Sequence, residues 1–570
     1  MKKYSTVLLI VIIVLSTFYV QAETAEEQPM FLLGQNEKAE VIIAGKTISL
    51  ELGKNPIQLI TNSEGRKLIL CAGEANKAGN IEQGASLRLL APDLKSYEKT
   101  VQCDSSLTAY AIDNDQTTVW LAVRGGVVEK ENVKPKVYRV SLNSLEVLEK
   151  ELESIPCDVT VSGDGQWMAV TELGGAETPN SFLTIYEADS MVLAGRFDIA
   201  KNPGFVMFNN ENDSLVVAGY GYKYQENFKI PTKYFIRLKE PVPAGADVID
   251  LLSLQSQKID LGIANNEFIV GNNATIYTIV SEEMKGIVRA VGPKGLLWER
   301  NCDFVPKYIQ ERPGTEEVWI IGGKNISIIE KTTGEILKSI SAPNEVKPFL
   351  FLENSAYAYG YNMNNRKLNI MNLDNLSIEK TLAAGSTGFA VLKTAAFVAS
   401  SISYYDSLQP RYVNGVRMPQ NVQPVHWINS PQGNIVPCLE KNKLYMLNSF
   451  LAQIYTYDLQ KDEVDKKLGN FGQNSMYLQM APNRKYVVLV SGDGWKLIST
   501  ETDKAVLNFN PSGVSVRLAF QAAEAPTPYF SPDGKRIYIP DKSKITVIDL
   551  EKAKKLANLK SDTKDAMICW

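Results

Sequence analysis

The chain has 570 residues, with 60 Lys and Arg against 64 Asp and Glu and a single histidine, His426. This nearly neutral balance gives no reason to expect a nucleic-acid partner, because phosphate binding needs clustered basic residues. One histidine also argues against His-based metal sites and against a Ser-His-Asp or Cys-His device, and no Gly-x-Ser-x-Gly motif accompanies it. We therefore expect no metal, no cofactor and no catalytic residue, and we favour a binding role over an enzymatic one.

The first 22 residues have the composition of a signal peptide. Lys2 and Lys3 precede an apolar stretch from Val7 to Val20, and Val20-Gln21-Ala22 is a small-residue cleavage site. The stretch is about fourteen residues long, short of the roughly 20 that span a bilayer. No Cys occurs before Cys71, so no lipidated Cys follows the signal. We expect a secreted or periplasmic protein without a membrane span after cleavage.

A hairpin phrase recurs along the rest of the chain. It is an apolar, often β-branched run, a small or polar residue, a polar turn and a second strand, with clear copies at 326–334, 368–373, 453–460 and 545–552. The small or polar position falls at Ala91, Ser141, Glu187, Gly292, Glu330, Asn372, Asp458, Ser499 and Asp549. Most neighbours are roughly 40–50 residues apart, the period of a four-stranded propeller blade. Two intervals are about double, and weaker copies near 251–261 and 412–417 are expected to fill them.

Two more strands joined by a tight turn precede each clear hairpin. Residues 529–539 give the model copy, and 159–165 and 478–484 repeat it. Asp-Gly and Pro-Asn pairs between alternating apolar runs favour hairpin turns. Four short antiparallel strands per unit predict an all-β protein, a β-propeller.

The chain resembles the WD40-like and surface-layer (YVTN-type) propeller superfamily. The resemblance rests on Ser-Pro-Asp-Gly-Lys-Arg-Ile-Tyr-Ile at 531–539 and Ile-Asp-Leu at 548–550, and it covers nearly all of residues 31–561. The Gly-His and Trp-Asp signature of true WD40 repeats is absent, as is the regular Trp of quinone-binding propellers, although the turn Thr333-Gly334-Glu335 is similar to theirs. The resemblance implies a fold and no particular activity, because propellers host many functions.

About eleven units can be counted, plus a lone hairpin at 41–52. That number exceeds the usual four to eight blades of one ring. We therefore predict a signal peptide at 1–22, an N-terminal propeller at 23–302 and a C-terminal propeller at 303–570. The alternative is one ring with long insertions. The N-terminal hairpin is expected to supply strands to a later blade and close a ring.

Five long loops follow a predicted second strand, at 74–84, 125–135, 174–180, 219–232 and 403–423. Such loops emerge together on one face of a propeller, where binding sites commonly lie. Two loop regions carry the candidate binding residues, which are Tyr220, Tyr222, Tyr224, Tyr404, Tyr405, Arg411, Tyr412, His426 and Trp427. Tyr and Trp suit protein or glycan surfaces, so we expect a protein or glycan partner. In the alternative interpretation these rings only pack the loops onto the scaffold.

Other residues have simpler interpretations. Trp120, Trp167 and Trp319 lie in predicted second strands and are expected in the core, whereas Trp495 follows a Gly-Asp-Gly turn and could be exposed. The acidic clusters at 113–115 and 210–213 are explained by turns more simply than by Ca²⁺. Six cysteines allow 15 pairings, and none is favoured.

The alternative function is a polysaccharide- or lactone-acting hydrolase or lyase that uses carboxylates at the axis.

Overall fold

The computed structural model describes most of the chain after residue 28. The described residues are 29–34, 38–43, 46–76, 80–128, 131–174, 181–221, 243–262, 266–271, 273–282, 285–353, 355–362, 365–383, 412–413, 416–417, 432–448, 453–470, 475–491, 494–509, 528–541, 544–560 and 567–569. Within them no helix is both long enough and apolar enough to cross a membrane.

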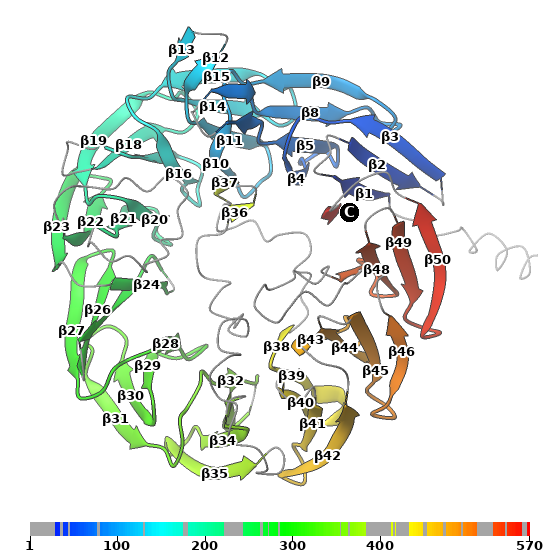
Figure 1. Cartoon of the computed structure of the whole chain (residues 1–570). Coiled ribbons are helices and arrows are strands. Elements are labelled where there is room, and N and C mark those ends of the chain that lie inside the picture. The colour runs from blue at the N-terminus through cyan, green and yellow to red at the C-terminus, as the bar shows by residue number, and fades with distance from the viewer. Residues whose placement is uncertain are drawn as a thin grey trace, which may run out of the picture.

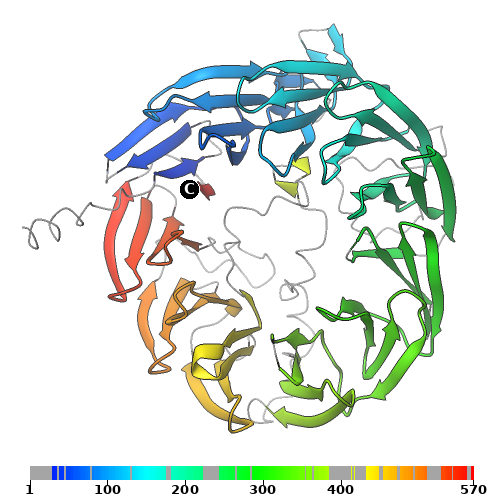
Figure 2. The same ribbon diagram turned by 180° about the vertical axis from the view of Figure 1, so that it is seen from behind.

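The described strands form eleven antiparallel four-stranded blades around one ring (Figures 1 and 2). Blades are numbered here in chain order, and their strands are given from the axis outward. Blade 1 consists of β51 (Met567–Cys569), β1 (Met30–Leu33), β2 (Lys38–Ile43) and β3 (Lys46–Glu51). Blade 2 consists of β4 (Pro56–Thr61), β5 (Lys67–Cys71), β8 (Ser86–Leu90) and β9 (Tyr97–Gln102). Blade 3 consists of β10 (Leu107–Ile112), β11 (Thr118–Val123), β14 (Lys136–Ser141) and β15 (Val147–Glu151).

The next five blades follow without interruption. Blade 4 has β16 (Pro156–Val161), β17 (Trp167–Glu172), β18 (Ser181–Glu187) and β19 (Leu193–Ile199). Blade 5 has β20 (Pro203–Phe208), β21 (Ser214–Gly219), β22 (Ala244–Asp250) and β23 (Gln255–Gly262). Blade 6 has β24 (Asn266–Val270), β25 (Ile276–Glu282), β26 (Lys285–Gly292) and β27 (Gly295–Cys302). Blade 7 has β28 (Tyr308–Glu311), β29 (Glu317–Gly322), β30 (Asn325–Glu330) and β31 (Ile336–Ser341). Blade 8 has β32 (Leu350–Phe351), β33 (Tyr357–Asn362), β34 (Lys367–Asn372) and β35 (Ser377–Ala383).

A long connection separates blade 8 from the last three blades. Blade 9 has β39 (Ile435–Cys438), β40 (Lys443–Asn448), β41 (Gln453–Asp458) and β42 (Glu463–Asn470), with the 3₁₀ turn η2 (Leu439–Lys441) after its first strand. Blade 10 has β43 (Ser475–Met480), β44 (Tyr486–Ser491), β45 (Gly494–Ser499) and β46 (Ala505–Phe509). Blade 11 has β47 (Tyr529–Phe530), β48 (Arg536–Asp541), β49 (Lys544–Asp549) and β50 (Lys554–Lys560). The remaining short strands are β6 (Glu74–Ala75), β7 (Ile81–Gln83), β12 (Gly126–Val128), β13 (Glu131–Val133), β36 (Tyr412–Val413), β37 (Val416–Arg417) and β38 (Gln432–Gly433).

The turns that the sequence predicts between first and second strands are present. In blade 11 the Ser531 hydroxyl accepts the backbone N–H of Arg536 at 2.9 Å, and Asp533 accepts that of Lys535 at 3.0 Å. Gly534 has a φ of 65°. The short polar side chains satisfy the turn's backbone donors, and glycine adopts the left-handed conformation without strain.

The core is divided into eleven apolar clusters, one at each junction between neighbouring blades. Side chains alternate along each strand, so one set faces the preceding blade and the other faces the following blade. Trp120 and Trp319 are buried at two of these junctions, as predicted, and Trp167 packs against a third. Trp495, for which the sequence left exposure open, is buried with only 3% exposure and fills the junction of blades 10 and 11.

The two ends of the described chain meet in blade 1, which closes the ring (Figure 1). Strand β51 pairs with β1 through Phe31 with Cys569, Leu32 with Ile568 and Leu33 with Met567. Residues of β1 and β2 then pack on blade 11 and on blade 2. The prediction that the N-terminal hairpin closes a ring is confirmed, but the hairpin supplies no strands to a later blade: it belongs to blade 1, and the last strand of the chain completes that blade.

The blades follow one another around a single ring, which was the alternative interpretation of the sequence. Residue 302 ends β27 of blade 6, and one apolar cluster crosses this point, joining Trp298 and Cys302 to Ile309 and Ile320 of blade 7. The indole N–H of Trp298 also donates to the Lys331 carbonyl at 2.7 Å. Whether 23–302 and 303–570 are separate folding units stays a prediction.

The two long intervals between repeats have different causes. Near 251–261 the weaker copy is real, since β22 and β23 complete blade 5. Near 412–417 the prediction was wrong, because β36 and β37 form a small hairpin that belongs to no blade of its own and pairs with β10 of blade 3. The extra length is an insertion between blades 8 and 9.

In the described part of the chain, five buried cysteines take part in no disulfide bond: Cys71, Cys103, Cys157, Cys302 and Cys438. Burial raises the thiol pKa of Cys71 and of Cys302 to about 11 and that of Cys103 to about 12. Thiolate is the reactive form, so burial keeps these three side chains inert at neutral pH.

Candidate functional site

Four of the five predicted loops connect second and third strands of consecutive blades. The loop at 74–84 lies between β5 and β8, that at 125–135 between β11 and β14, that at 174–180 between β17 and β18, and that at 219–232 between β21 and β22. In an antiparallel blade, this connection emerges on the same side as the linker to the next blade. These loops of blades 2 to 5 therefore share one face, called the loop face below.

The fifth loop, 403–423, does not follow a second strand. It lies within the connection between β35, the outer strand of blade 8, and β39, the inner strand of blade 9. The prediction was wrong because the hairpin near 412–417 was counted as part of a blade. Its described residues lie beside the inner strand β10 (Figure 1).

Two loops of the loop face fold into hairpins that touch each other. Strands β6 and β7 form a hairpin on blade 2, and β12 and β13 form one on blade 3. Asn80, which directly precedes β7, forms a parallel bridge with Val127 of β12. We call β6, β7, β12 and β13 the hairpin platform. It joins two blades above the ring through backbone pairing, which orders both hairpins.

The first hairpin of the platform is anchored to the linker between blades 1 and 2. The Lys54 ammonium pairs with Glu74 at 2.6 Å and with Glu82 at 3.3 Å, and the Lys54 backbone N–H donates to Gln83 at 2.7 Å. Asn55 donates from its side chain to the Gly73 carbonyl at 2.8 Å. The linker thus binds both strands of the hairpin.

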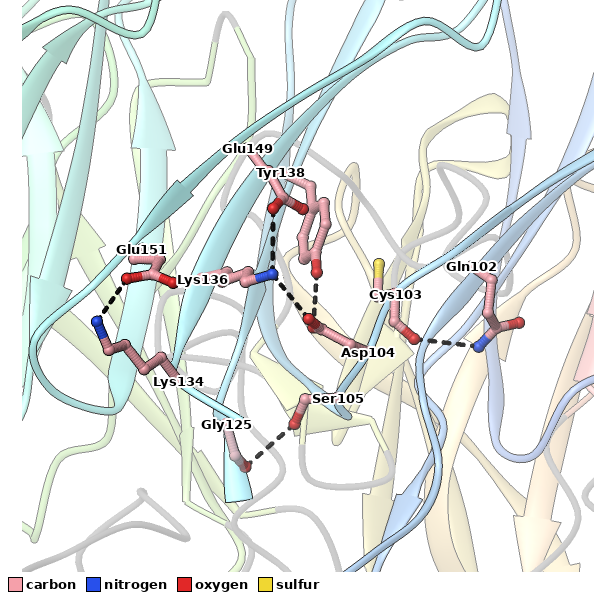
Figure 3. A network of polar contacts seen from close by, with 10 residues as sticks. All are labelled: Gln102, Cys103, Asp104, Ser105, Gly125, Lys134, Lys136, Tyr138, Glu149 and Glu151. Atoms are coloured by element: carbon pink, nitrogen blue, oxygen red, sulfur yellow. Dashed lines mark hydrogen bonds and ion pairs between the residues drawn. The ribbon is translucent and has the colours of Figure 1, made fainter. Parts of the chain in front are cut away.

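A second polar network anchors the base of β12 and β13 to the linker between blades 2 and 3. Asp104 accepts the Lys136 ammonium at 2.8 Å and the Tyr138 hydroxyl at 2.6 Å. Figure 3 shows both side chains pointing toward Asp104, with Glu149 on the other side of the lysine at 3.1 Å. The hydroxyl of Ser105, the next linker residue, donates to the Gly125 carbonyl at 3.1 Å, at the start of the second hairpin.

The electrostatics of this network favour its charged form. The hydrogen bond from Lys136 to Asp104 is the main cause that raises the pKa of the Lys136 ammonium. Burial, followed by the hydrogen bond to Asp104, raises the pKa of the Tyr138 phenol. At neutral pH the lysine is therefore a cation and the phenol a neutral donor, so both hold the carboxylate in place.

The linkers further along the face are held by buried carboxylates. Glu172, at the end of β17, accepts the backbone N–H groups of Glu153 and Ser154 at 3.1 and 3.0 Å and the Thr184 hydroxyl at 2.7 Å. Asp247 of β22 accepts the backbone N–H of Ala200 at 2.9 Å. Each of the four linkers that enter blades 2 to 5 is thus bound by a side chain of the blade that follows it.

Of the two carboxyl groups, that of Asp247 lies in the less favourable environment. It is 2% exposed, and its Oδ1 has no hydrogen-bond partner among the described residues. Burial raises the pKa of its carboxyl to about 6, although the Ala200 N–H opposes the shift. The group therefore changes charge in a mildly acidic range.

Of the predicted binding residues, Tyr220 has a described side chain. It packs on Phe205 and Phe268, with ring centroids 6.3 and 4.8 Å away, between blades 5 and 6. This packing agrees with the alternative that some loop rings secure the loops to the scaffold. For Tyr412 the structure describes only the backbone, in β36. The other predicted residues lie outside the described part of the chain, and they are Tyr222, Tyr224, Tyr404, Tyr405, Arg411, His426 and Trp427.

Sequence reasoning missed the residues that hold the platform. Lys136 and Tyr138 carry a weak signal, since residues two apart on a strand share one face. Asp104 is 32 residues earlier in the chain, and nothing local indicates that the three side chains meet. The acidic turns at 113–115 and 210–213 connect first and second strands, as expected. The described residues contain no group of three or more His, Cys, Asp or Glu side chains that could hold a metal ion.

Comparison with known proteins identifies no family for this chain. No family model matches the sequence, and no curated protein does. Solved structures with a similar chain course include the dihydro-heme d1 dehydrogenase NirN (TM-score 0.32, 11% identity, 94% of this chain and 79% of that one). They also include the Myceliophteria thermophila Cps50 (Swd1) β-propeller domain (0.26, 11%, 56% and 96%) and Citrobacter koseri AztD (0.29, 12%, 69% and 94%). At these values the similarity carries no argument about activity or ligand. The chain is a β-propeller protein.

Proposed function

We propose that this chain is an exported, non-enzymatic β-propeller protein that binds a protein or glycan partner through its loop face. The observation that carries the proposal is the hairpin platform, in which loops of two blades pair through Asn80 and Val127 above linkers fixed by polar side chains. A preorganised surface loses little conformational entropy when it binds. The signal-like segment at 1–22 supports export, and the turn motifs at 531–539 and 548–550 support a distant relation to WD40-like or YVTN propellers.

The platform is polar, which suits a partner with hydrogen-bonding groups. The side chains of Glu74 and Glu82 are 43% and 46% exposed, and those of Lys134 and Glu151, which pair at 2.6 Å beside the second hairpin, are 67% and 55% exposed. Exposed ion pairs contribute little to stability. These groups therefore remain available for exchange with groups of a partner.

The enzymatic alternative needs two carboxylates close together at the axis. Among the described inner strands, acidic residues occur once each in three blades, as Asp158, Glu267 and Glu311. Glu311 accepts the Tyr277 hydroxyl at 2.8 Å and pairs with Lys331 at 3.0 Å, a structural arrangement between blades 6 and 7. No observation in the described chain favours the hydrolase or lyase over the binding role.

The test compares wild type with a variant that lacks the second hairpin. Gly126 and Val133 are paired neighbours, so replacing residues 127–132 by Asn-Gly shortens the hairpin to a two-residue turn without moving β11 or β14. Both proteins are screened on a glycan array and in pull-downs from the native envelope or secreted fraction. We expect at least one glycan or protein to bind wild type and to bind the variant more than tenfold more weakly.

The matched control lies on the opposite face. Leu252 is 87% exposed in the turn between β22 and β23, and Leu252→Ser should leave binding unchanged. If the variant without the second hairpin folds and still binds every ligand of the wild type, the hairpin platform is not the binding site. Tyr222→Ala and Tyr405→Ala test the aromatic loops separately, and unchanged affinity in both would exclude those loops.

A further inference from the structure

The face of the ring opposite the loop face carries the exposed apolar side chains of this protein. The turns between first and second strands and between third and fourth strands lie there, and we call it the turn face. Among the described residues, every large apolar side chain that is 40% or more exposed lies at this face, in a turn or within the first three residues of an outer strand. These side chains occur in blades 3 to 7 and 9 to 11; Leu252 is 87% exposed, Leu193 57% and Ile336 52%. Exposed apolar groups gathered on one face are typical of an interaction surface.

One side of the turn face is acidic. The six turns of blades 3 to 5 on this face contain seven acidic residues and no basic residue. Asp189 pairs with Arg139 of β14 at 2.7 Å, yet its side chain remains 90% exposed. This side therefore attracts cationic groups and repels anionic ones. The acidic residues are Asp113, Asp115, Glu146, Asp164, Asp189, Glu211 and Asp213.

The other side of the turn face carries exposed lysines. Figure 1 shows blades 9 to 11 across the ring from blades 3 to 5. The six turns of blades 9 to 11 on this face contain seven basic and six acidic residues, and four of the acidic ones already form an ion pair with a lysine or arginine. The lysines of these turns that form no ion pair in the described part of the chain are Lys485, Lys504, Lys535 and Lys552.

We propose that the turn face binds the turn face of a second copy of this chain, related to the first by a twofold axis. An axis that lies in the plane of this face and passes through blade 7 exchanges blades 3, 4 and 5 with blades 11, 10 and 9. The acidic turns of each copy then lie over the exposed lysines of the other, and this contact occurs twice in one dimer.

The same axis also brings apolar groups together. Ile336 and Leu337 of blade 7 are 52% and 47% exposed, and the axis places them beside their own counterparts in the second copy. Orientations that stack acidic turns on acidic turns are disfavoured by like-charge repulsion, so charge selects this arrangement. The loop face of both copies stays open, and the inference does not depend on the function proposed for that face.

The test measures self-association of the full chain by sedimentation velocity over a range of concentrations. Wild type should form a dimer, and its Kd should rise at least tenfold between about 50 and about 500 mM NaCl because salt screens the charge pairs. A wild type that stays monomeric at low salt would overturn the proposal. A monomeric wild type that binds phosphatidylcholine vesicles would also overturn it and would assign the turn face to a lipid surface.

The first variant reverses charges on the acidic side. Asp115→Lys, Glu146→Lys, Asp189→Lys and Glu211→Lys are combined in one chain; each substitution changes the charge by two, so the net charge of these turns changes from −7 to +1. This side then lies over turns whose net charge is also +1, so the dimer should be at least tenfold weaker than that of wild type. A Kd equal to that of wild type in the folded variant would contradict the proposal.

The second variant reverses charges on the lysine side and allows a rescue. Lys485→Glu, Lys504→Glu and Lys552→Glu together change the net charge of the turns of blades 9 to 11 from +1 to −5, which places anionic turns over anionic turns. This variant should also dimerise at least tenfold more weakly. An equimolar mixture of the two variants should regain a dimer, because each reversed side then faces the opposite charge. A mixture that stays monomeric would overturn the proposal.

The control reverses a charge on the loop face. Lys307 lies in the linker between blades 6 and 7, and its side chain is 51% exposed. Lys307→Glu should leave the Kd of the dimer within twofold of wild type. Because both charge-reversed variants keep the loop face, they should still bind its ligands, so failure of this proposal and failure of the proposed function give different results.

Discussion

The Tyr138 hydroxyl donates a 2.6 Å hydrogen bond to Asp104, so the third strand of blade 3 is bound to the linker that leaves blade 2. The same arrangement recurs between blades 9 and 10, where Asp503 accepts the Tyr445 hydroxyl at 2.8 Å and the Lys443 ammonium at 2.6 Å. In both cases a lysine and a tyrosine two residues apart on one strand reach a single carboxylate. Neighbouring blades are thus joined by polar contacts as well as by apolar clusters.

At these two sites the replacement of Tyr by Phe should lower the free energy of unfolding by different amounts. Tyr138→Phe should lower the free energy of unfolding by about 1 kcal/mol, because the Asp104 side chain is 36% exposed and water can replace the hydroxyl. Tyr445→Phe should lower it by about 2 kcal/mol or more, because the Asp503 side chain is only 5% exposed. Urea unfolding of both variants measures the difference. Equal losses would show that burial of the carboxylate does not set the effect.

Asp247 predicts a pH dependence of stability. Its folded-state pKa of about 6 lies above the ordinary value of 3.8, so its contribution is fully present below pH 4 and is lost as the pH rises through 6. The shift corresponds to about 3 kcal/mol between pH 4 and 7.5. In Asp247→Asn, the change in unfolding free energy between these two pH values should be smaller by about that amount. Urea unfolding at each pH measures it.

The control for that experiment has the opposite sign. Backbone N–H groups of Lys552 and Glu551 lower the pKa of Asp549, so Asp549→Asn should remove stability that is present above pH 4. If Asp247→Asn leaves the pH profile unchanged, the carboxylate is ionised without penalty in the folded protein.

The anchoring of the first hairpin of the platform predicts that two glycine substitutions differ in how much stability they cost. Gly73 has a φ of 72°, and a Cβ there would lie 2.3 Å from the Gln83 carbonyl oxygen. Gly65 has a φ of 79° but no atom within 4 Å of such a Cβ. Gly65→Ala should cost about 1 kcal/mol from the left-handed backbone alone, and Gly73→Ala should cost more. Gly73→Ala should also speed hydrogen exchange in residues 74–83, whereas Gly65→Ala should not.

Ring closure predicts a local effect of proline in the last strand. Ile568→Pro removes a backbone donor from β51 opposite Leu32 of β1, so stability should fall by about 3 kcal/mol or more. Hydrogen exchange of residues 30–33 should rise with it. Ile568→Val keeps the amide and should leave exchange in these residues close to wild type.

The junction at residue 302 tests the division of the chain into two folding units. One apolar cluster crosses it, so the full chain should unfold in a single transition by circular dichroism and by tryptophan fluorescence. Trp298→Ala should lower the transition midpoint strongly, since deleting a buried Trp costs about 3–5 kcal/mol. Two separated transitions, with only one shifted by Trp298→Ala, would support independent folding units at 23–302 and 303–570.

Most of the blade architecture could be predicted because its signals are local. Turn residues such as Asp533 and Gly534 and the polar positions from Ser141 to Asp549 mark strand ends within ten residues of the strands they join. The hairpin at 412–417 was misassigned for the same reason. Its local sequence is that of a hairpin, whereas its pairing with β10 depends on residues some 300 positions away.

The candidate site was less predictable because its contacts join distant segments. Asn80 and Val127 meet only because blades 2 and 3 are neighbours, and neither residue carries a sequence signal for pairing. Tyr220 was predicted on the loop from its ring alone. Its packing on Phe205 and Phe268 depends on how blades 5 and 6 meet, which no periodicity reveals.

The pairing of β1 with β51 has a consequence for biosynthesis. Strand β1 leaves the ribosome more than 500 residues before Met567 is made. At a translation rate of about 5–20 residues per second, the apolar residues of β1 therefore remain unpaired with β51 for roughly half a minute to two minutes. Nascent chains therefore carry an unfinished first sheet throughout translation, and a chaperone that shields this edge would raise the yield of intact rings.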